Sequence, residues 1–165
     1  MSEQVVINSL EFAQQGKRLQ GEIAVADLSR LQEYLHSSGG GLSYTLSGKI
    51  GENAKPYLVC TVQGELALQC QRCLDALAFK LDIVSTLELV ENADDFLPLE
   101  GEEDSADAIP VNPAMDVPAL VEEEVLLSLP IAPLHPLAEC AAANYRRLSG
   151  LGEANPFGVL AKLKK

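Results

Sequence analysis

The sequence predicts an α+β domain built on one antiparallel sheet, with a long central hairpin and helices appended to it. Three observations predict it. Apolar residues occupy every second position from residue 58 to residue 70, which is the period of a strand with one buried face. From residue 77 to residue 89 the alternation resumes on odd positions. A helical pattern that begins with a capping residue follows at Asp116.

The N-terminal part is expected to supply two short strands, a helix and a longer strand. Residues 5–7 and 19–25 are rich in β-formers and read as the short strands. Asp27 is a suitable N-cap for a helix that the Ser/Gly run 37–41 would end. Residues 42–50 alternate apolar and polar side chains, which is typical of a strand. The apolar face of the expected helix would consist of Leu28, Leu31 and Leu35.

The two alternating runs flank residues 71–75, so they predict a hairpin that turns there. Residues 91–108 are acidic, contain Pro98 and Gly101 and break the periodicity, and we expect them to form a mobile loop. The pair Asn-Pro at the start of residues 155–165 predicts a short C-terminal helix. A helix of that length needs something to dock against.

The helix that follows Asp116 tolerates Pro118 in its first turn, where the missing N–H is not needed. Pro130 and Pro133 would end it. Its three consecutive acids, residues 122–124, are expected to lie mostly on the solvated face. The opposite, apolar face would consist of Leu120, Val121, Val125 and Leu129.

The chain has 165 residues, which suits a single domain over residues 1–165 with a sizeable core. It contains no Trp, so Leu, Val, Ile and Ala must build that core. No apolar run is long enough to span a bilayer, and the first residues lack the pattern of a signal peptide. We therefore expect a cytoplasmic protein with no membrane contact, whose four cysteines are thiols or metal ligands.

Charge is distributed unevenly along the chain. Residues 81–145 contain 15 acids and neither Lys nor Arg, whereas residues 146–165 contain 1 acid and 5 bases. The acidic segment repels phosphate and favours a basic partner, although such a segment can also simply keep a protein soluble. The C-terminal bases could contact RNA phosphates, or could merely solvate a docked helix; they are Arg146, Arg147, Lys162, Lys164 and Lys165.

Cys70 and Cys73 form a C-x-x-C motif at the predicted hairpin turn, and this spacing lets two sulfur atoms face one tetrahedral metal. A structural zinc needs two more ligands, and His135 and Cys140 are the available ones. Plain thiols at a turn are an equally good interpretation. A redox site fits less well, because such sites place the first cysteine at a helix N-terminus, and a strand pattern follows here.

Cys60 is expected to be an ordinary buried residue. It precedes Cys70 by ten residues on one strand, so the two cysteines would lie about 33 Å apart if the strand is straight. Nowhere does the sequence contain a P-loop, a dinucleotide-binding glycine motif, a zinc-protease motif or a nucleophile elbow. We therefore expect no enzyme and no small-molecule substrate.

Three segments together resemble the large ribosomal RNA subunit accumulation family (YceD-like). They are the strand that runs into residues 70–74, the stretch 121–135 and the tail 155–160, in that order and with an acidic stretch between the first two. The resemblance implies a role in synthesis, processing or stability of large-subunit (23S) rRNA. It implies no catalytic residue. Some relatives carry a second cysteine near the position of Cys140, and this chain does not.

Two classes of function remain. The first is a ribosome-biogenesis factor that acts by binding a precursor of the large subunit, through a basic ribosomal protein, through rRNA or through both. The second is a metal- or thiol-dependent enzyme that acts on RNA or protein. The resemblance and the acidic charge favour the first.

Overall fold

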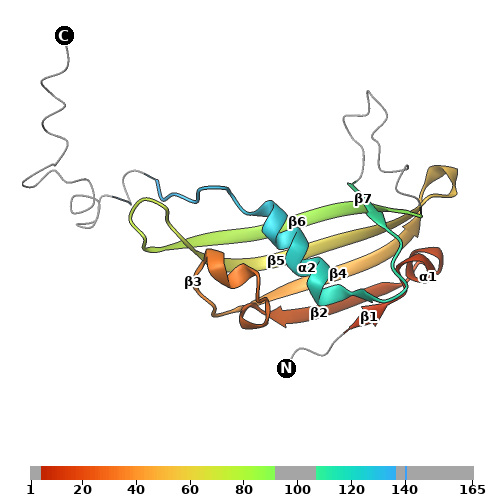
Figure 1. Cartoon of the computed structure of the whole chain (residues 1–165), viewed down its shortest axis with the longest axis horizontal. Helices are drawn as coiled ribbons and strands as arrows, with labels where there is room; N and C mark the ends of the chain where they lie inside the picture. The colour runs from red at the N-terminus through yellow and green to blue at the C-terminus, as the bar shows by residue number, and fades with distance from the viewer. Residues whose placement is uncertain (1–4, 92–106, 137–139, 141–165) are drawn as a thin grey trace, which may run out of the picture.

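The computed structural model describes residues 5–91, 107–136 and 140. Their main feature is a six-stranded sheet in the order β2-β4-β5-β6-β7, with β3 paired to β5, beside a two-stranded sheet of β1 and β8 (Figure 1). The strands are β1 Val6–Ile7, β2 Arg18–Ala24, β3 Leu35–Ser37, β4 Gly41–Ile50, β5 Pro56–Gln69, β6 Ala76–Val90, β7 Asp107–Pro110 and β8 Met115–Asp116. The helices are α1 Ser9–Gln14 and α2 Val117–Ser128, and the 3-10 turns are η1 Val25–Asp27, η2 Leu31–Tyr34 and η3 Glu52–Ala54.

The β5–β6 hairpin is the central element, as the sequence predicts. The strands pair antiparallel from Tyr57 opposite Glu88 to Gln69 opposite Ala76, so they remain in register along their whole length. Side chains alternate between the two faces of a strand, and the apolar set therefore points to one side. The predicted α+β architecture is confirmed.

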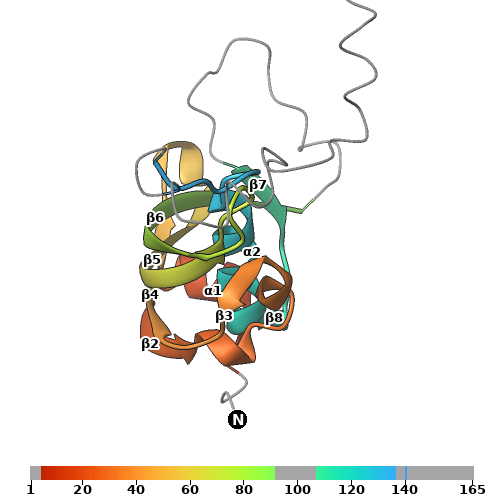
Figure 2. The ribbon, with the colours of Figure 1, turned by 90° about the vertical axis from the view of Figure 1, so that its left-hand side faces the viewer.

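Among the described residues, helices cover one face of the large sheet and none covers the other, which we call the open face. Figure 2 shows α1 and α2 on the same side of the sheet. The side chains on that side include Leu46, Leu58, Val62 and Leu87, which are at most 1% exposed. Gly48 lets α1 approach closely, because a Cβ there would lie 2.6 Å from the Cα of Ala13. The core thus lies between the sheet and the two helices.

The helix predicted after Asp27 does not form, and this is a wrong prediction. The chain instead makes η1, η2 and the short strand β3, which pairs with β5. The physical reason is a long-range contact: the carboxylate of Glu122 accepts hydrogen bonds from the amides of Arg30 (2.7 Å) and Leu31 (3.2 Å). Since these amides already have a distant partner, no helix is needed to satisfy them.

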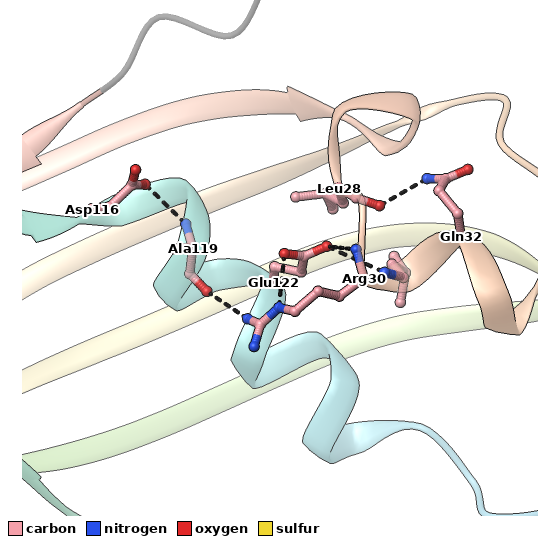
Figure 3. A network of polar contacts seen from close by, with 7 residues as sticks. Leu28, Arg30, Gln32, Asp116, Ala119 and Glu122 are labelled. Atoms are coloured by element: carbon pink, nitrogen blue, oxygen red, sulfur yellow. Dashed lines mark hydrogen bonds and ion pairs between the residues drawn. The ribbon is translucent and has the colours of Figure 1, made fainter.

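Helix α2 begins as predicted, since the side chain of Asp116 accepts a hydrogen bond from the amide of Ala119 (Figure 3). The expectation that residues 122–124 are solvated is correct for Glu123 alone. Glu122 and Glu124 are each 7% exposed. Figure 3 shows that Glu122 points from α2 towards the backbone at Arg30. It therefore attaches the helix to the part of the chain between η1 and η2.

The acidic loop predicted over 91–108 is shorter at its end than expected. Residues 107 and 108 belong to β7, which pairs parallel with β6, so the sheet is mixed rather than wholly antiparallel. Residues 92–106 and the predicted C-terminal helix 155–165 lie outside the described residues. Among the residues that are described, no helix has the length and apolar character needed to cross a membrane.

Candidate metal centre

The hairpin turn holds Cys70 and Cys73 in a tight loop. The amide of Cys70 donates to the carbonyl of Asp75 (3.0 Å), and the amide of Leu74 donates to the carbonyl of Cys70 (2.9 Å). Leu74 has a φ of 64°, in the left-handed region that side chains other than Gly rarely adopt. The turn therefore curls back on itself and brings the two cysteines to the same side.

The segment after α2 passes this turn. Figure 1 shows it running from the end of α2 to the tip of the hairpin. The amide of Gln71 donates to the carbonyl of Pro133 (2.9 Å), which fastens the two segments together. The amide of Cys140 donates to the carbonyl of Pro136 (3.0 Å). These two hydrogen bonds place His135 and Cys140 beside the C-x-x-C motif.

All four predicted ligands converge. One donor atom from each of Cys70, Cys73, His135 and Cys140 lies within 4.8 Å of every other. The sulfur of Cys70 is 3.7 Å from that of Cys140, and Nδ1 of His135 is 3.3 Å from the sulfur of Cys73 and 3.9 Å from that of Cys140. The three thiols are at most 3% exposed. The structure thus brings together residues that the sequence separates by more than sixty positions.

The imidazole of His135 has a defined orientation. Its Nε2 lies 3.0 Å from the carbonyl oxygen of Ala76. A carbonyl oxygen only accepts hydrogen bonds, so Nε2 donates here, and a neutral imidazole in this orientation has its lone pair on Nδ1. That lone pair faces the thiols of Cys73 and Cys140. Such a hydrogen bond on the far ring nitrogen is the usual support of a metal-binding histidine.

The thiols have unequal acidity. Burial raises the pKa of Cys70, but hydrogen bonds from the backbone at Cys73, His135 and Arg72 outweigh it and lower the pKa to about 5. One of these, from the amide of His135, spans 3.5 Å. A backbone hydrogen bond at Asp75 lowers the pKa of Cys73, whereas burial and the neighbouring thiols raise it, and the pKa rises to about 11. Cys70 is therefore the group that this backbone most readily holds as a thiolate.

Cys60 stands apart from this cluster. It belongs to the main core with no exposed surface, as the sequence predicts, and burial followed by the charge of Glu124 raises its pKa to about 12. A redox site of the thioredoxin kind is not what the geometry shows, because β6 rather than a helix follows the motif. The predicted phosphate-contacting bases lie outside the described residues: Arg146, Arg147, Lys162, Lys164 and Lys165.

Sequence reasoning missed two features that position the site. The carbonyl of Ala76 orients His135, and a backbone group carries no signal in the residue type. Glu122 fixes the start of the segment by anchoring α2 to Arg30. Its signal was available but ambiguous, since one of three consecutive helical acids must point close to the apolar face.

Comparison with known proteins covers most of the chain. The family described as "Large ribosomal RNA subunit accumulation protein YceD" matches residues 58–164. A protein of that name from Haemophilus influenzae is 27% identical over 174 residues, which cover 98% of this chain and 95% of the relative. No solved structure matches the chain. The matched region contains the hairpin, α2 and all four convergent donors, and the chain belongs to the YceD family of large ribosomal RNA subunit accumulation proteins.

Proposed function

We propose that this protein is a cytoplasmic ribosome-biogenesis factor that supports the accumulation of 23S rRNA by binding a precursor of the large subunit. The family match over residues 58–164 carries the proposal, because the relatives that share this region are named for large ribosomal RNA subunit accumulation. Binding rather than catalysis is the part that the geometry supports.

The open face of the sheet offers a broad surface for such binding. Its central positions carry uncharged side chains. The central residues are Gln20, Thr45, Ser47, Val59, Thr61, Val84 and Thr86, which lie in adjacent register on β2, β4, β5 and β6. Val84 is 69% exposed, although its type is usually buried. An uncovered sheet face of this kind suits a macromolecular partner better than a small substrate.

The alternative is a metal- or thiol-dependent enzyme, and the donor cluster argues against it. A catalytic zinc keeps a coordination position free for water or substrate, whereas four protein donors fill a tetrahedral shell. Three of these donors are buried thiols with at most 3% exposure. A metal bound by all four donors would therefore have no open position for a substrate.

The partner we propose is a basic ribosomal protein or a protein–RNA particle, not naked RNA. Residues 81–145 contain 15 acids and no Lys or Arg, which attracts a basic chain. Several of these acids are engaged within the fold: Asp116 caps α2, Glu122 holds Arg30 and Glu88 pairs with Lys55. The acids of this segment that make no such contact would therefore contribute most of the attraction to a basic partner.

The proposal has a genetic and a biochemical test. Deleting the gene should lower the ratio of large-subunit to small-subunit rRNA, and the full-length protein should restore it. The pure protein should co-sediment with large-subunit precursor particles and should not degrade rRNA. An unchanged rRNA ratio in the deletion strain would contradict the proposed process, and RNA turnover by the pure protein would favour the enzyme.

The choice of partner is tested by salt. Binding to isolated rRNA should be weak and should disappear near physiological ionic strength, while binding to a basic large-subunit protein should persist. Replacing the C-terminal bases Lys162, Lys164 and Lys165 with Gln should weaken the RNA contact only. Tight, salt-resistant binding to bare rRNA would contradict the assigned role of the acidic segment.

A further inference from the structure

We infer that Cys70, Cys73, His135 and Cys140 bind one zinc ion, which fastens the segment after α2 to the tip of the β5–β6 hairpin. The ion is structural: it closes a site and joins two segments, and it takes part in no reaction. This inference does not depend on the proposed function, because it concerns the pure protein alone.

The spacing of the donor atoms fits a tetrahedral shell. Zinc–sulfur bonds of about 2.3 Å and zinc–nitrogen bonds of about 2.0 Å place sulfur atoms about 3.8 Å apart and a sulfur and a nitrogen about 3.6 Å apart. The structure has 3.7 Å between the sulfurs of Cys70 and Cys140, and 3.3 Å and 3.9 Å from Nδ1 of His135 to two sulfurs. Small side-chain adjustments would bring all four donors to one centre.

A disulfide is the competing arrangement of the same thiols. A disulfide joins two sulfurs at about 2.05 Å, so the third thiol and the imidazole would take no part in the bond. Here the sulfurs of Cys70 and Cys140 are 3.7 Å apart, and all four donor atoms lie within 4.8 Å of one another. The geometry is that of a shared ligand rather than of one bonded pair.

The polar groups around the cluster suit a metal that carries thiolates. Three thiolates and a neutral imidazole around Zn²⁺ leave a net charge of about −1, which needs donors nearby. The amide of His135 donates to the sulfur of Cys70 at 3.5 Å, and Nε2 of the same residue donates to Ala76. Nη1 of Arg72, between the two cysteines of the motif, is buried with no hydrogen-bond partner among the described residues. A buried cation of this kind is costly unless negative charge lies close by.

The apolar surroundings give a second reason for a metal. The three thiols form a cluster separate from the main core, and among the described residues Leu77 is the one partly buried apolar residue that packs against it. Burial of a cluster this small contributes little to the contact between the two chain segments. Within the described residues, three hydrogen bonds also join the segments: from the amide of Gln71 to Pro133, from the amide of His135 to the sulfur of Cys70, and from Nε2 of His135 to Ala76. Metal coordination would add to the free energy that joins them, as it does in small zinc-dependent folds.

Zinc is the expected metal because of the donor types. Thiolates and imidazole select zinc over magnesium or calcium, which prefer oxygen. A complete set of four protein donors is typical of structural rather than catalytic zinc. The matched region of the family ends at residue 164, so the whole donor set lies within it.

The experiment measures the metal in the full-length protein purified without chelator and with reductant. Elemental analysis should find about one zinc per chain, and X-ray absorption at the zinc edge should find three sulfurs and one nitrogen as neighbours. Replacing Cys140→Ser or Cys73→Ser should remove most of the zinc. The control is Cys60→Ala, a buried thiol outside the cluster, which should keep the zinc in full.

The zinc content and zinc neighbours of the wild-type protein test the inference even if a cysteine variant fails to fold. Wild-type protein that contains no zinc after reconstitution with zinc chloride under reducing conditions would overturn the inference. So would a disulfide between Cys70 and Cys140 found by mass spectrometry of protein alkylated before reduction. Zinc bound with mainly oxygen neighbours would place the metal at another site and would also overturn it.

Discussion

Glu122 makes the contact on which the packing of α2 depends, and replacing it tests this. Its carboxylate accepts hydrogen bonds from the amides of Arg30 (2.7 Å) and Leu31 (3.2 Å), and it pairs with the guanidinium of Arg30 at 3.1 Å. A hydrogen bond to a charged acceptor contributes about 1.5 kcal/mol or more, so the two amides account for about 3 kcal/mol. The side chain of Arg30 is 51% exposed, so the ion pair adds at most about 0.5 kcal/mol.

Glu122→Ala should therefore lower the free energy of unfolding by about 3 kcal/mol, measured by urea denaturation at constant zinc concentration. Glu122→Gln keeps one acceptor for the amides and should cost about half as much. Glu123→Ala, one position along the same helix on an exposed residue, is the matched control and should change stability by less than about 0.5 kcal/mol. Equal losses for Glu122→Ala and Glu123→Ala would refute the role of this carboxylate.

Three further perturbations have defined outcomes. The thiol of Cys60, with a pKa raised to about 12 by burial, should resist iodoacetamide at about pH 8 until urea unfolds the protein, and early labelling would contradict its burial. Leu74→Gly should stabilise the protein by about 0.5 kcal/mol, because Gly adopts a φ of 64° without the steric cost that Leu bears; a loss of stability would show that the exposed Leu74 side chain makes a compensating contact. Gly48→Ala should cost about 2 kcal/mol in urea denaturation, since its Cβ would overlap the carbonyl oxygen of Phe12, and an unchanged midpoint would mean that α1 can move away.

The strands were predictable because one face of each is buried and the other is not. Side chains in a strand alternate between the two faces of the sheet. When one face is covered, apolar residues therefore recur at every second position, and this pattern is clearest in β5 and β6. The turn was predictable from the change of parity between the two runs. Strand β7 was hidden, because it is four residues long and follows a stretch without periodicity.

The helices were less predictable, for two different reasons. Helix α2 carries its own N-cap, Asp116, and an apolar face long enough to recognise. The region after Asp27 has leucines at helical spacing, yet its amides are satisfied by Glu122, about ninety residues away. Helix α1 has six residues, too few for a periodic pattern, and only the cap at Asn8 marks it. The spacing of apolar residues predicts a helix from neighbouring residues alone, and a hydrogen-bond acceptor far along the chain can favour another backbone conformation.

The candidate site shows the same limit. The C-x-x-C spacing places Cys70 and Cys73 on one turn, so their proximity follows from sequence alone. The addition of His135 and Cys140 could only be proposed from residue type, because the chain between the two halves has no pattern that sets their distance. Two backbone hydrogen bonds place them beside the motif, from Gln71 to Pro133 and from Cys140 to Pro136, and neither involves a side chain.

The two ends of the central hairpin are stabilised in different ways. Towards its open end, β5 and β6 contribute Leu58, Val62, Leu81 and Leu87 to the main core, with α2 lying across them. At its tip, the strands end in a cluster of three thiols with Leu77, separate from that core. Among the described residues, apolar burial is extensive in the first region and slight in the second, where the contacts of His135 with Cys70 and Ala76 and the hydrogen bond from Gln71 to Pro133 join the two segments.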